Sequence, residues 1–88
     1  MKKVEGLTTE EMGILKVPLE TIDVRGVNTI ADLRKIDKIC KVIEGALDGV
    51  IELEDADYQY MVQRFQSFQT WNPAFRGKIL TLAEKIGV

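Results

Sequence analysis

Residues 52–73, ELEDADYQYMVQRFQSFQTWNP, contain one helix and the start of another. Apolar side chains recur in this stretch at the three- and four-residue spacing of one helix face: Tyr58, Met61, Val62, Phe65 and Phe68. The stretch ends in Asn72-Pro73. Asparagine is a good helix cap, and proline is favoured at the first helical position. The pattern therefore predicts a helix from about Asp55 to Thr70 and a second helix from Pro73.

Two further apolar stripes flank this stretch. The earlier helix is capped by Asn28 or Thr29 and buries Leu33, Ile36, Ile39, Cys40, Ile43 and Leu47. It ends at Gly45 or at Asp48-Gly49, and the spacing out to Leu47 favours the later end. The last helix runs from Pro73 to Gly87 and buries Phe75, Ile79, Leu82, Ala83 and Ile86.

The residue pattern of the N-terminal segment, residues 1–27, differs from the helical patterns of the later stretches. Thr8 and Glu11 have the spacing of a capping box, but Gly13 weakens a helix and Pro18 ends one. Beyond Gly13, β-branched and apolar residues are typical of extended chain: Val17, Leu19, Ile22 and Val24. We expect a helical turn followed by extended or short-strand structure. Such a strand needs a partner strand, which either a hairpin or a second copy of the chain supplies.

Short links between amphipathic helices favour antiparallel neighbours. The 88 residues therefore predict one domain of mainly α class. Its architecture is an antiparallel three-helix bundle over residues 28–88, preceded by the extended segment. Val50 to Leu53 forms a tight connection in which Ile51 and Leu53 point inward.

Composition limits the chemistry. Twelve basic and fourteen acidic residues nearly cancel, which argues against a general nucleic-acid binder. The chain has no histidine, and its one cysteine, Cys40, excludes an internal disulfide and a cysteine-type zinc site. No apolar stretch is long enough to span a membrane, and no secretory signal is visible. The default expectation is a cytoplasmic protein that has no catalytic activity and no cofactor.

Two charged clusters carry alternative functions. The acids of the 52–57 run are either helix-capping residues or a divalent-cation site in a metal-assisted enzyme: Glu52, Glu54, Asp55 and Asp57. A basic strip on the earlier helix is either a solvated face or a nucleic-acid contact of a regulator: Arg34, Lys35, Lys38 and Lys41. Further basic residues follow in the C-terminal part, and they too are either solvent-exposed helix residues or binding contacts: Arg64, Arg76, Lys78 and Lys85.

Cys40 and the aromatic residues complete the candidates. Cys40 lies on the apolar stripe and is expected to be a packed core thiol. Tyr60 and Trp71 fall outside the apolar stripe of their helix. Exposed aromatic residues often anchor protein interfaces, so both are candidate protein-interaction residues. For Trp71, a plug over the corner between the last two helices is the alternative.

Four stretches resemble small proteins encoded in tailed bacteriophages and prophages: Gly26 to Lys35, Ile43-Glu44, Leu53 to Tyr58, and Trp71. The resemblance covers roughly residues 26–86, and no functional residue can be carried over from it. It implies a phage-encoded accessory or assembly protein of unassigned biochemistry. The small core and the aromatic residues outside the apolar stripe favour association, so we expect the protein to bind another protein or itself, as a homodimer. The alternative function is a nucleic-acid-binding regulator that uses the basic strip.

Overall fold

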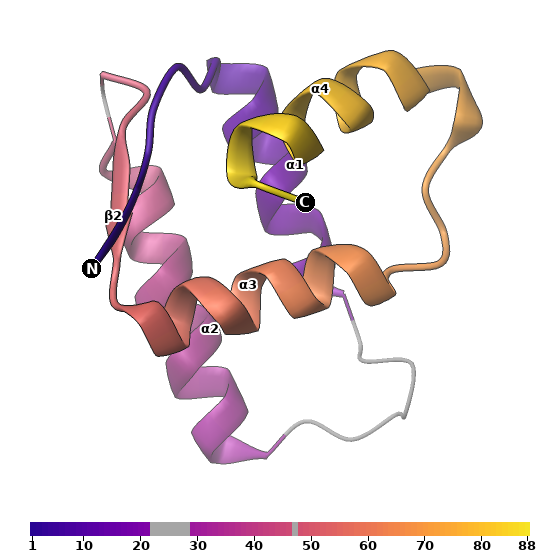
Figure 1. Cartoon of the computed structure of the whole chain (residues 1–88). Coiled ribbons are helices and arrows are strands. Elements are labelled where there is room, and N and C mark those ends of the chain that lie inside the picture. The colour runs from indigo at the N-terminus through magenta and orange to yellow at the C-terminus, as the bar shows by residue number, and fades with distance from the viewer. Residues whose placement is uncertain (22–28, 47) are drawn as a thin grey trace.

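A computed structural model describes residues 1–21, 29–46 and 48–88 of the chain. Within those ranges the protein is mainly helical, as predicted (Figure 1). The elements in chain order are β1 (Lys2–Val4), α1 (Thr9–Glu20), α2 (Ile30–Glu44), β2 (Ile51–Leu53), α3 (Asp55–Ser67), the 3₁₀ turn η1 (Pro73–Phe75) and α4 (Arg76–Ile86). Because α1 and a two-stranded sheet are present, the predicted three-helix bundle is not confirmed.

The N-terminal helix α1 is the largest departure from the prediction. Its start was predicted correctly, since Thr8 and Glu11 form a capping box. The Glu11 N–H donates to Thr8 Oγ1 at 3.1 Å, and the Thr8 N–H donates to Glu11 Oε1 at 2.9 Å. The extended structure predicted after Gly13 is wrong for Val17 and Leu19, which are helical. The remainder of that prediction lies outside the described residues.

Helix α1 continues through Pro18 because burial outweighs the local cost. Relative to alanine, a glycine inside a helix costs about 1 kcal/mol and a proline about 3 kcal/mol. Leu15 and Leu19 are 0 % and 1 % exposed. Fully burying one such side chain contributes about 1.5–3 kcal/mol. Pro18 also lies near the end of the helix, where Arg64 of α3 supplies donors to the free carbonyls.

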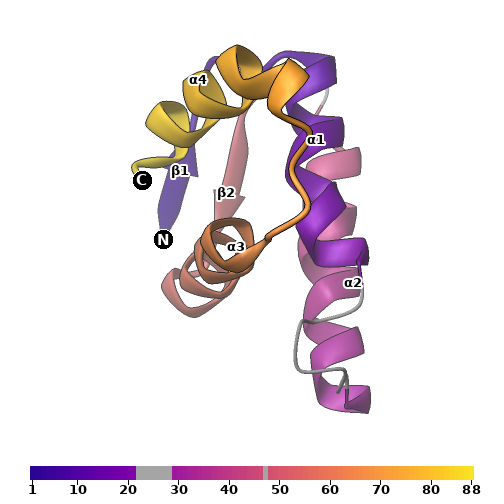
Figure 2. The same ribbon diagram turned by 90° about the vertical axis from the view of Figure 1, so that its right-hand side faces the viewer.

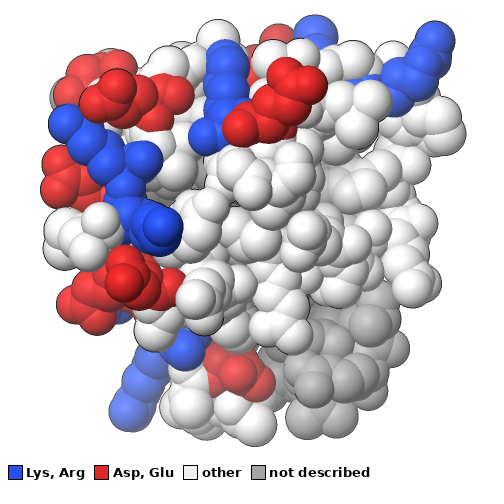
Figure 3. All heavy atoms as spheres, in the orientation of Figure 1, with Lys and Arg blue, Asp and Glu red and all other residues white. Residues whose placement is uncertain are grey.

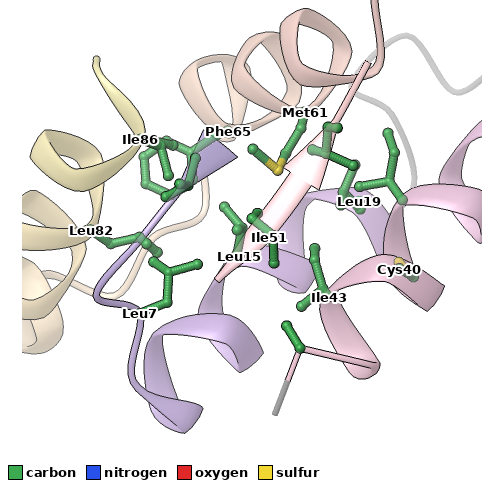
Figure 4. Packing of buried hydrophobic residues seen from close by; sticks show 14 of the residues in the cluster. Leu7, Leu15, Leu19, Cys40, Ile43, Ile51, Met61, Phe65, Leu82 and Ile86 are labelled. Atoms are coloured by element: carbon green, nitrogen blue, oxygen red, sulfur yellow. The ribbon is translucent and has the colours of Figure 1, made fainter. Parts of the chain in front are cut away.

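Helix α1 contacts each of the other three α-helices in the described ranges. Figure 2 shows α4 across one end of α1 and α3, seen end-on, near the other end. Residues from all four helices and both strands meet in one core, part of which Figure 4 shows. Leu15, Met61 and Leu82 are at most 1 % exposed and come from three different helices.

The small sheet ties the N-terminus to the middle of the chain. Strand β1 pairs antiparallel with β2, with Lys2 opposite Leu53 and Val4 opposite Ile51. The prediction placed extended structure later in the N-terminal segment and left its partner open, whereas the partner of β1 is β2 of the same chain. The inward alternation predicted for Ile51 and Leu53 is confirmed, because both are buried and Glu52 is exposed.

Helix α2 begins where predicted and ends earlier. Thr29 is its N-cap and accepts the Asp32 N–H at 3.1 Å, whereas Asn28 lies outside the described residues. The helix ends at Glu44 with Gly45 as its C-cap, so the preference for a later end was wrong. Leu33, predicted to be buried, is 50 % exposed. In both ribbon views the first turns of α2 extend beyond the other described helices (Figures 1 and 2).

The asparagine–proline start of the last helix is confirmed, but its first turn is a 3₁₀ turn. Asn72 Oδ1 accepts the Ala74 N–H at 3.0 Å, and α4 proper begins at Arg76. Of the positions predicted to be buried within α4, Ile79, Leu82 and Ile86 are confirmed, and Ala83 is half-buried against the core. Phe75 was predicted to be buried and is 49 % exposed. It ends the 3₁₀ turn, so it is out of phase with the α-helical stripe that follows.

Candidate functional site

An apolar pocket of about 350 Å³ opens between α1 and the corner that joins α3 to α4. We call it the Trp71 pocket. It is lined by Glu10, Ile14 and Val17 of α1, by Phe68, Thr70, Trp71 and Asn72 of the linker, and by Phe75 and Ile79 of η1 and α4. A volume of this size lies at the lower end of the range of ligand pockets.

Two local features of the sequence build the pocket walls. On α1, Glu10, Ile14 and Val17 are four and three residues apart, so they share one helix face. Opposite them, the chain leaves α3 in extended conformation at Phe68 and turns back at Asn72. Figure 1 shows the linker swinging out from α3 before it returns to α4. The lining side chains of α1 and of the linker face each other across this hollow.

Trp71 lines the pocket and also packs against the hydrophobic core. Its ring contacts Phe65 with 5.1 Å between ring centroids and Phe68 with 4.6 Å, the latter edge-on. It is half-buried and packs against the core while lining the pocket. The sequence offered an interface anchor and a corner plug as alternatives for Trp71. Trp71 therefore packs against Phe65 and Phe68 and also lines an accessible pocket.

Little charge lines the pocket. Glu10 is its one charged lining residue in the described part of the chain, and it forms a salt bridge with Lys78 at 2.5 Å. Arg76 lies nearby in the sequence and donates to the Pro73 carbonyl at 3.2 Å. In Figure 3 most of the charged side chains lie along the left and upper parts of the face, and the linker side is largely white. The surface around the pocket therefore suits an apolar contact.

Tyr60, the other aromatic residue predicted to mediate interactions, lies apart from the lining of the pocket. It is half-buried and packs against the core. The Lys35 ammonium lies 5.3 Å from its ring centroid and the Arg64 guanidinium 6.0 Å. These distances are typical of cation–π contacts. Much of the Tyr60 ring is therefore engaged within the protein.

The basic strip of α2 is partly neutralised by acids of the same chain. Lys38 forms salt bridges with Asp57 at 3.0 Å and Glu54 at 3.5 Å. Lys41 pairs with Asp37 at 3.0 Å. In each case the hydrogen bond that the lysine donates to the aspartate is the main reason that the lysine pKa is raised. Arg34 is exposed, and Lys35 lies over Tyr60 as described.

Three of the four acids of the run, Glu54, Asp55 and Asp57, pair with cations of the same chain. Glu54 is the N-cap residue of α3, and Asp55 and Asp57 lie in its first turn, which places negative charge at the positive end of the helix dipole. Asp55 pairs with the N-terminal ammonium of Met1 at 3.3 Å. Glu54 and Asp57 both form salt bridges with Lys38. In the described ranges no three histidine, cysteine or acidic side chains gather in a way that could hold a metal ion.

Cys40 is buried in the core, as predicted, at 7 % exposure. Burial is the main reason that the pKa of its thiol is raised, and the carboxylates of Glu20 and Glu44 contribute. A raised pKa keeps the thiol protonated at neutral pH, and the protonated form is a poor nucleophile. Cys40 therefore acts as a packed side chain of the hydrophobic core.

Sequence reasoning missed the role of Arg64, which was grouped with the C-terminal bases as a surface cation. It is 7 % exposed and donates to carbonyls at the end of α1. Its spacing contains a signal, because Arg64 follows Met61 by three residues and precedes Phe68 by four, both on the apolar face. A charged residue at a core position needs partners.

Comparison of the chain with protein-family models, with curated proteins and with solved structures found no match. Among the described helices, none combines the length and the hydrophobicity needed to cross a membrane.

Proposed function

We propose that this protein is a non-catalytic binding domain that recognises another protein through the Trp71 pocket. One observation carries the proposal. The pocket is apolar, and several of its lining side chains are left accessible in the folded chain. Val17 and Phe75 are 42 % and 49 % exposed, and Trp71 is half-buried. Accessible apolar side chains gathered around a concave surface mark binding sites in small proteins.

The proposed setting follows from the resemblance to small proteins of tailed bacteriophages and prophages. In that setting the partner is a component of phage assembly or a host factor taken over by the phage. The pocket supplies the contact. The ion pairs of Lys38 and of the Met1 ammonium are made with acids of the same chain. These internal pairs also weigh against the alternative of nucleic-acid binding through α2, since paired lysines release fewer counterions from a phosphate backbone.

Partner capture with matched variants tests this proposal. Tagged protein is expressed in the cells that naturally contain it, and the captured proteins are compared among wild type, Val17→Glu and Phe75→Ser. Both substitutions place polar groups at the pocket and lie at exposed positions, where folding tolerates change. We expect each to weaken capture of a specific partner by at least about tenfold, equivalent to about 1.4 kcal/mol.

Leu80→Ser is the control, because Leu80 is 62 % exposed on α4 and does not line the pocket. It should leave capture unchanged, and far-UV circular dichroism should be the same for all four proteins. Capture of the same proteins by wild type and both pocket variants would exclude the Trp71 pocket as the binding site.

A further inference from the structure

We infer that the Trp71 pocket holds one bulky aromatic side chain presented by the partner. This inference rests on the proposed function and names the chemistry of the contact. It differs from the other ways in which such a surface could be covered, by a second folded copy of the chain or by an aliphatic segment. The size of the pocket, the elements that border it, its ring chemistry and its charge support the inference.

The size of the pocket excludes a whole-domain interface as its main contact. Nine residues in the described part of the chain line it. Each side of a standard protein–protein interface contributes about 20–30 residues and buries about 800 Å². A second folded copy that used only this surface would bury too little area for a stable dimer. A volume of about 350 Å³ instead suits a single large side chain and its flanking backbone.

The pocket is bordered by several parts of the chain, which favours a side chain that enters end-on. Its lining residues come from α1, from the linker after α3, from η1 and from α4. An α-helix with its side chains is about 10–12 Å across and needs a groove open at both ends. A hollow bordered by several elements accepts an anchor that projects from a partner's turn, terminus or helix end.

The rings of the lining favour an aromatic anchor. Trp71 already contacts Phe65 and Phe68 in tilted and edge-on geometry, at 5.1 and 4.6 Å between centroids. Phe75 lies on the same pocket and is half exposed. An incoming ring extends this series of ring contacts. Aromatic pairs contribute beyond the apolar area that they bury, whereas an aliphatic side chain gains the area alone.

Charge favours a neutral anchor. The Glu10 carboxylate at the pocket is already paired with Lys78 at 2.5 Å, so an incoming cation would compete with an existing partner. Thr70 and Asn72 supply uncharged polar groups at the lining. A phenol O–H or an indole N–H can be accommodated beside them, and a charged head group cannot be balanced there.

Capped amino acids test the anchor separately from any partner. N-acetyl-phenylalanine amide, N-acetyl-leucine amide and N-acetyl-lysine amide are titrated into the full chain. Trp71, the only tryptophan, provides a fluorescence signal at the pocket, and the methyl groups of Ile14, Val17 and Ile79 provide nuclear magnetic resonance signals. We expect weak binding of the phenylalanine probe, about fivefold tighter than the leucine probe. The lysine probe should cause no saturable change.

Two variants that add the same ring at different places provide the control. Ile14→Phe fills the pocket from α1 and should abolish probe binding, whereas Leu80→Phe adds the ring to the exposed face of α4 and should leave it unchanged. Circular dichroism checks that both variants fold. If Ile14→Phe does not fold, Val17→Phe replaces it as the variant that fills the pocket.

Equal or tighter binding of the leucine probe would overturn the inference, as would binding that survives the filled pocket. A dimer in sedimentation that dissociates in Val17→Glu would also overturn it, because a second copy would then be the occupant. Loss of partner capture in the pocket variants without aromatic preference would reject the anchor alone. Aromatic preference with no partner captured would reject the proposed function alone.

Discussion

At the scale of single residues, Arg64 accounts for the end of α1. Its Nε and Nη2 donate to the Pro18 carbonyl at 3.0 and 2.7 Å. Nη2 also donates to the carbonyls of Leu19 at 3.4 Å and Thr21 at 2.6 Å. The last carbonyls of a helix have no partner within that helix, and a cation at this end complements the dipole. Arg64 thus joins α3 to α1 through the backbone of α1.

Arg64→Met should destabilise the protein by roughly 2–4 kcal/mol, because several partly buried carbonyls lose their donors together. Arg64→Lys should cost less, since an ammonium keeps the charge but lacks the planar fork of the guanidinium. Urea unfolding followed by circular dichroism measures both. Arg76→Met, at an exposed arginine, should stay within about 0.5 kcal/mol of wild type. A similarly small change for Arg64→Met would show that the carbonyls do not depend on this side chain.

At the scale of elements, two glycines have opposite roles. Gly49 precedes β2 and has φ +75°, and its carbonyl oxygen accepts a hydrogen bond from the Leu7 N–H at 3.0 Å. A Cβ added there would lie 2.3 Å from the Leu7 carbonyl oxygen. Gly13, inside α1, would place a Cβ in open space. The first glycine is required by the approach of two chain segments, and the second is not.

The two glycine-to-alanine substitutions should therefore change stability in opposite directions. Gly49→Ala forces backbone apart and imposes positive φ on a side chain, which should cost roughly 1–3 kcal/mol. Gly13→Ala should stabilise the protein by about 0.5–1 kcal/mol through helix propensity. Urea midpoints of the two variants and wild type test the pair. If both variants shifted in the same direction, the contrast between the two sites would be wrong.

An element could be predicted when the residues that determine it lie close together in the sequence. The capping boxes at Thr8 and Thr29 and the Asn72-Pro73 start are local signals, and the structure has all three. The length of α1 is not local. Local rules end that helix at Pro18, and it continues because Leu15 and Leu19 are buried by other elements and because a distant arginine satisfies its carbonyls.

The candidate site follows the same rule. Trp71 could be identified from sequence, since it lies off the apolar stripe beside a helix start. Its pocket could not, because one wall is α1, in the segment predicted to be largely extended. Sequence spacing shows which face of a helix is apolar. It does not show which distant segment stops short of covering that face and leaves Val17 and Phe75 exposed.

At the scale of the whole molecule, the two ends of the chain are fastened to each other and to the middle. The Lys85 ammonium of α4 donates to Glu11 Oε1 of α1 at 2.7 Å and to the Gly6 carbonyl at 2.8 Å. The Tyr58 hydroxyl of α3 donates to the Ile86 carbonyl. Glu11 is 6 % exposed, so its charge is held where solvent screens it poorly. Folding of the last helix is thereby linked to the ionisation of one carboxylate.

This link predicts a specific dependence of stability on pH. The hydrogen bond from Lys85 lowers the pKa of Glu11 below its ordinary value of 4.5, with burial opposing and the Thr8 hydrogen bonds assisting. A carboxylate whose pKa is lower in the folded state stabilises the fold above its unfolded pKa. That stabilisation is lost as pH falls through the folded pKa.

Glu11→Gln keeps an acceptor for the Thr8 N–H and removes the charge. It should destabilise the protein at pH 7 by roughly 1–2 kcal/mol, and the gap to wild type should close as pH falls well below 4.5. Urea midpoints measured at intervals from neutral to acidic pH test this, with Glu84→Gln as an exposed control that should keep a constant, small difference. A gap that stayed constant down to acidic pH would assign the contribution of Glu11 to its shape, and the Lys85 contact would then not be what fastens α4 to α1.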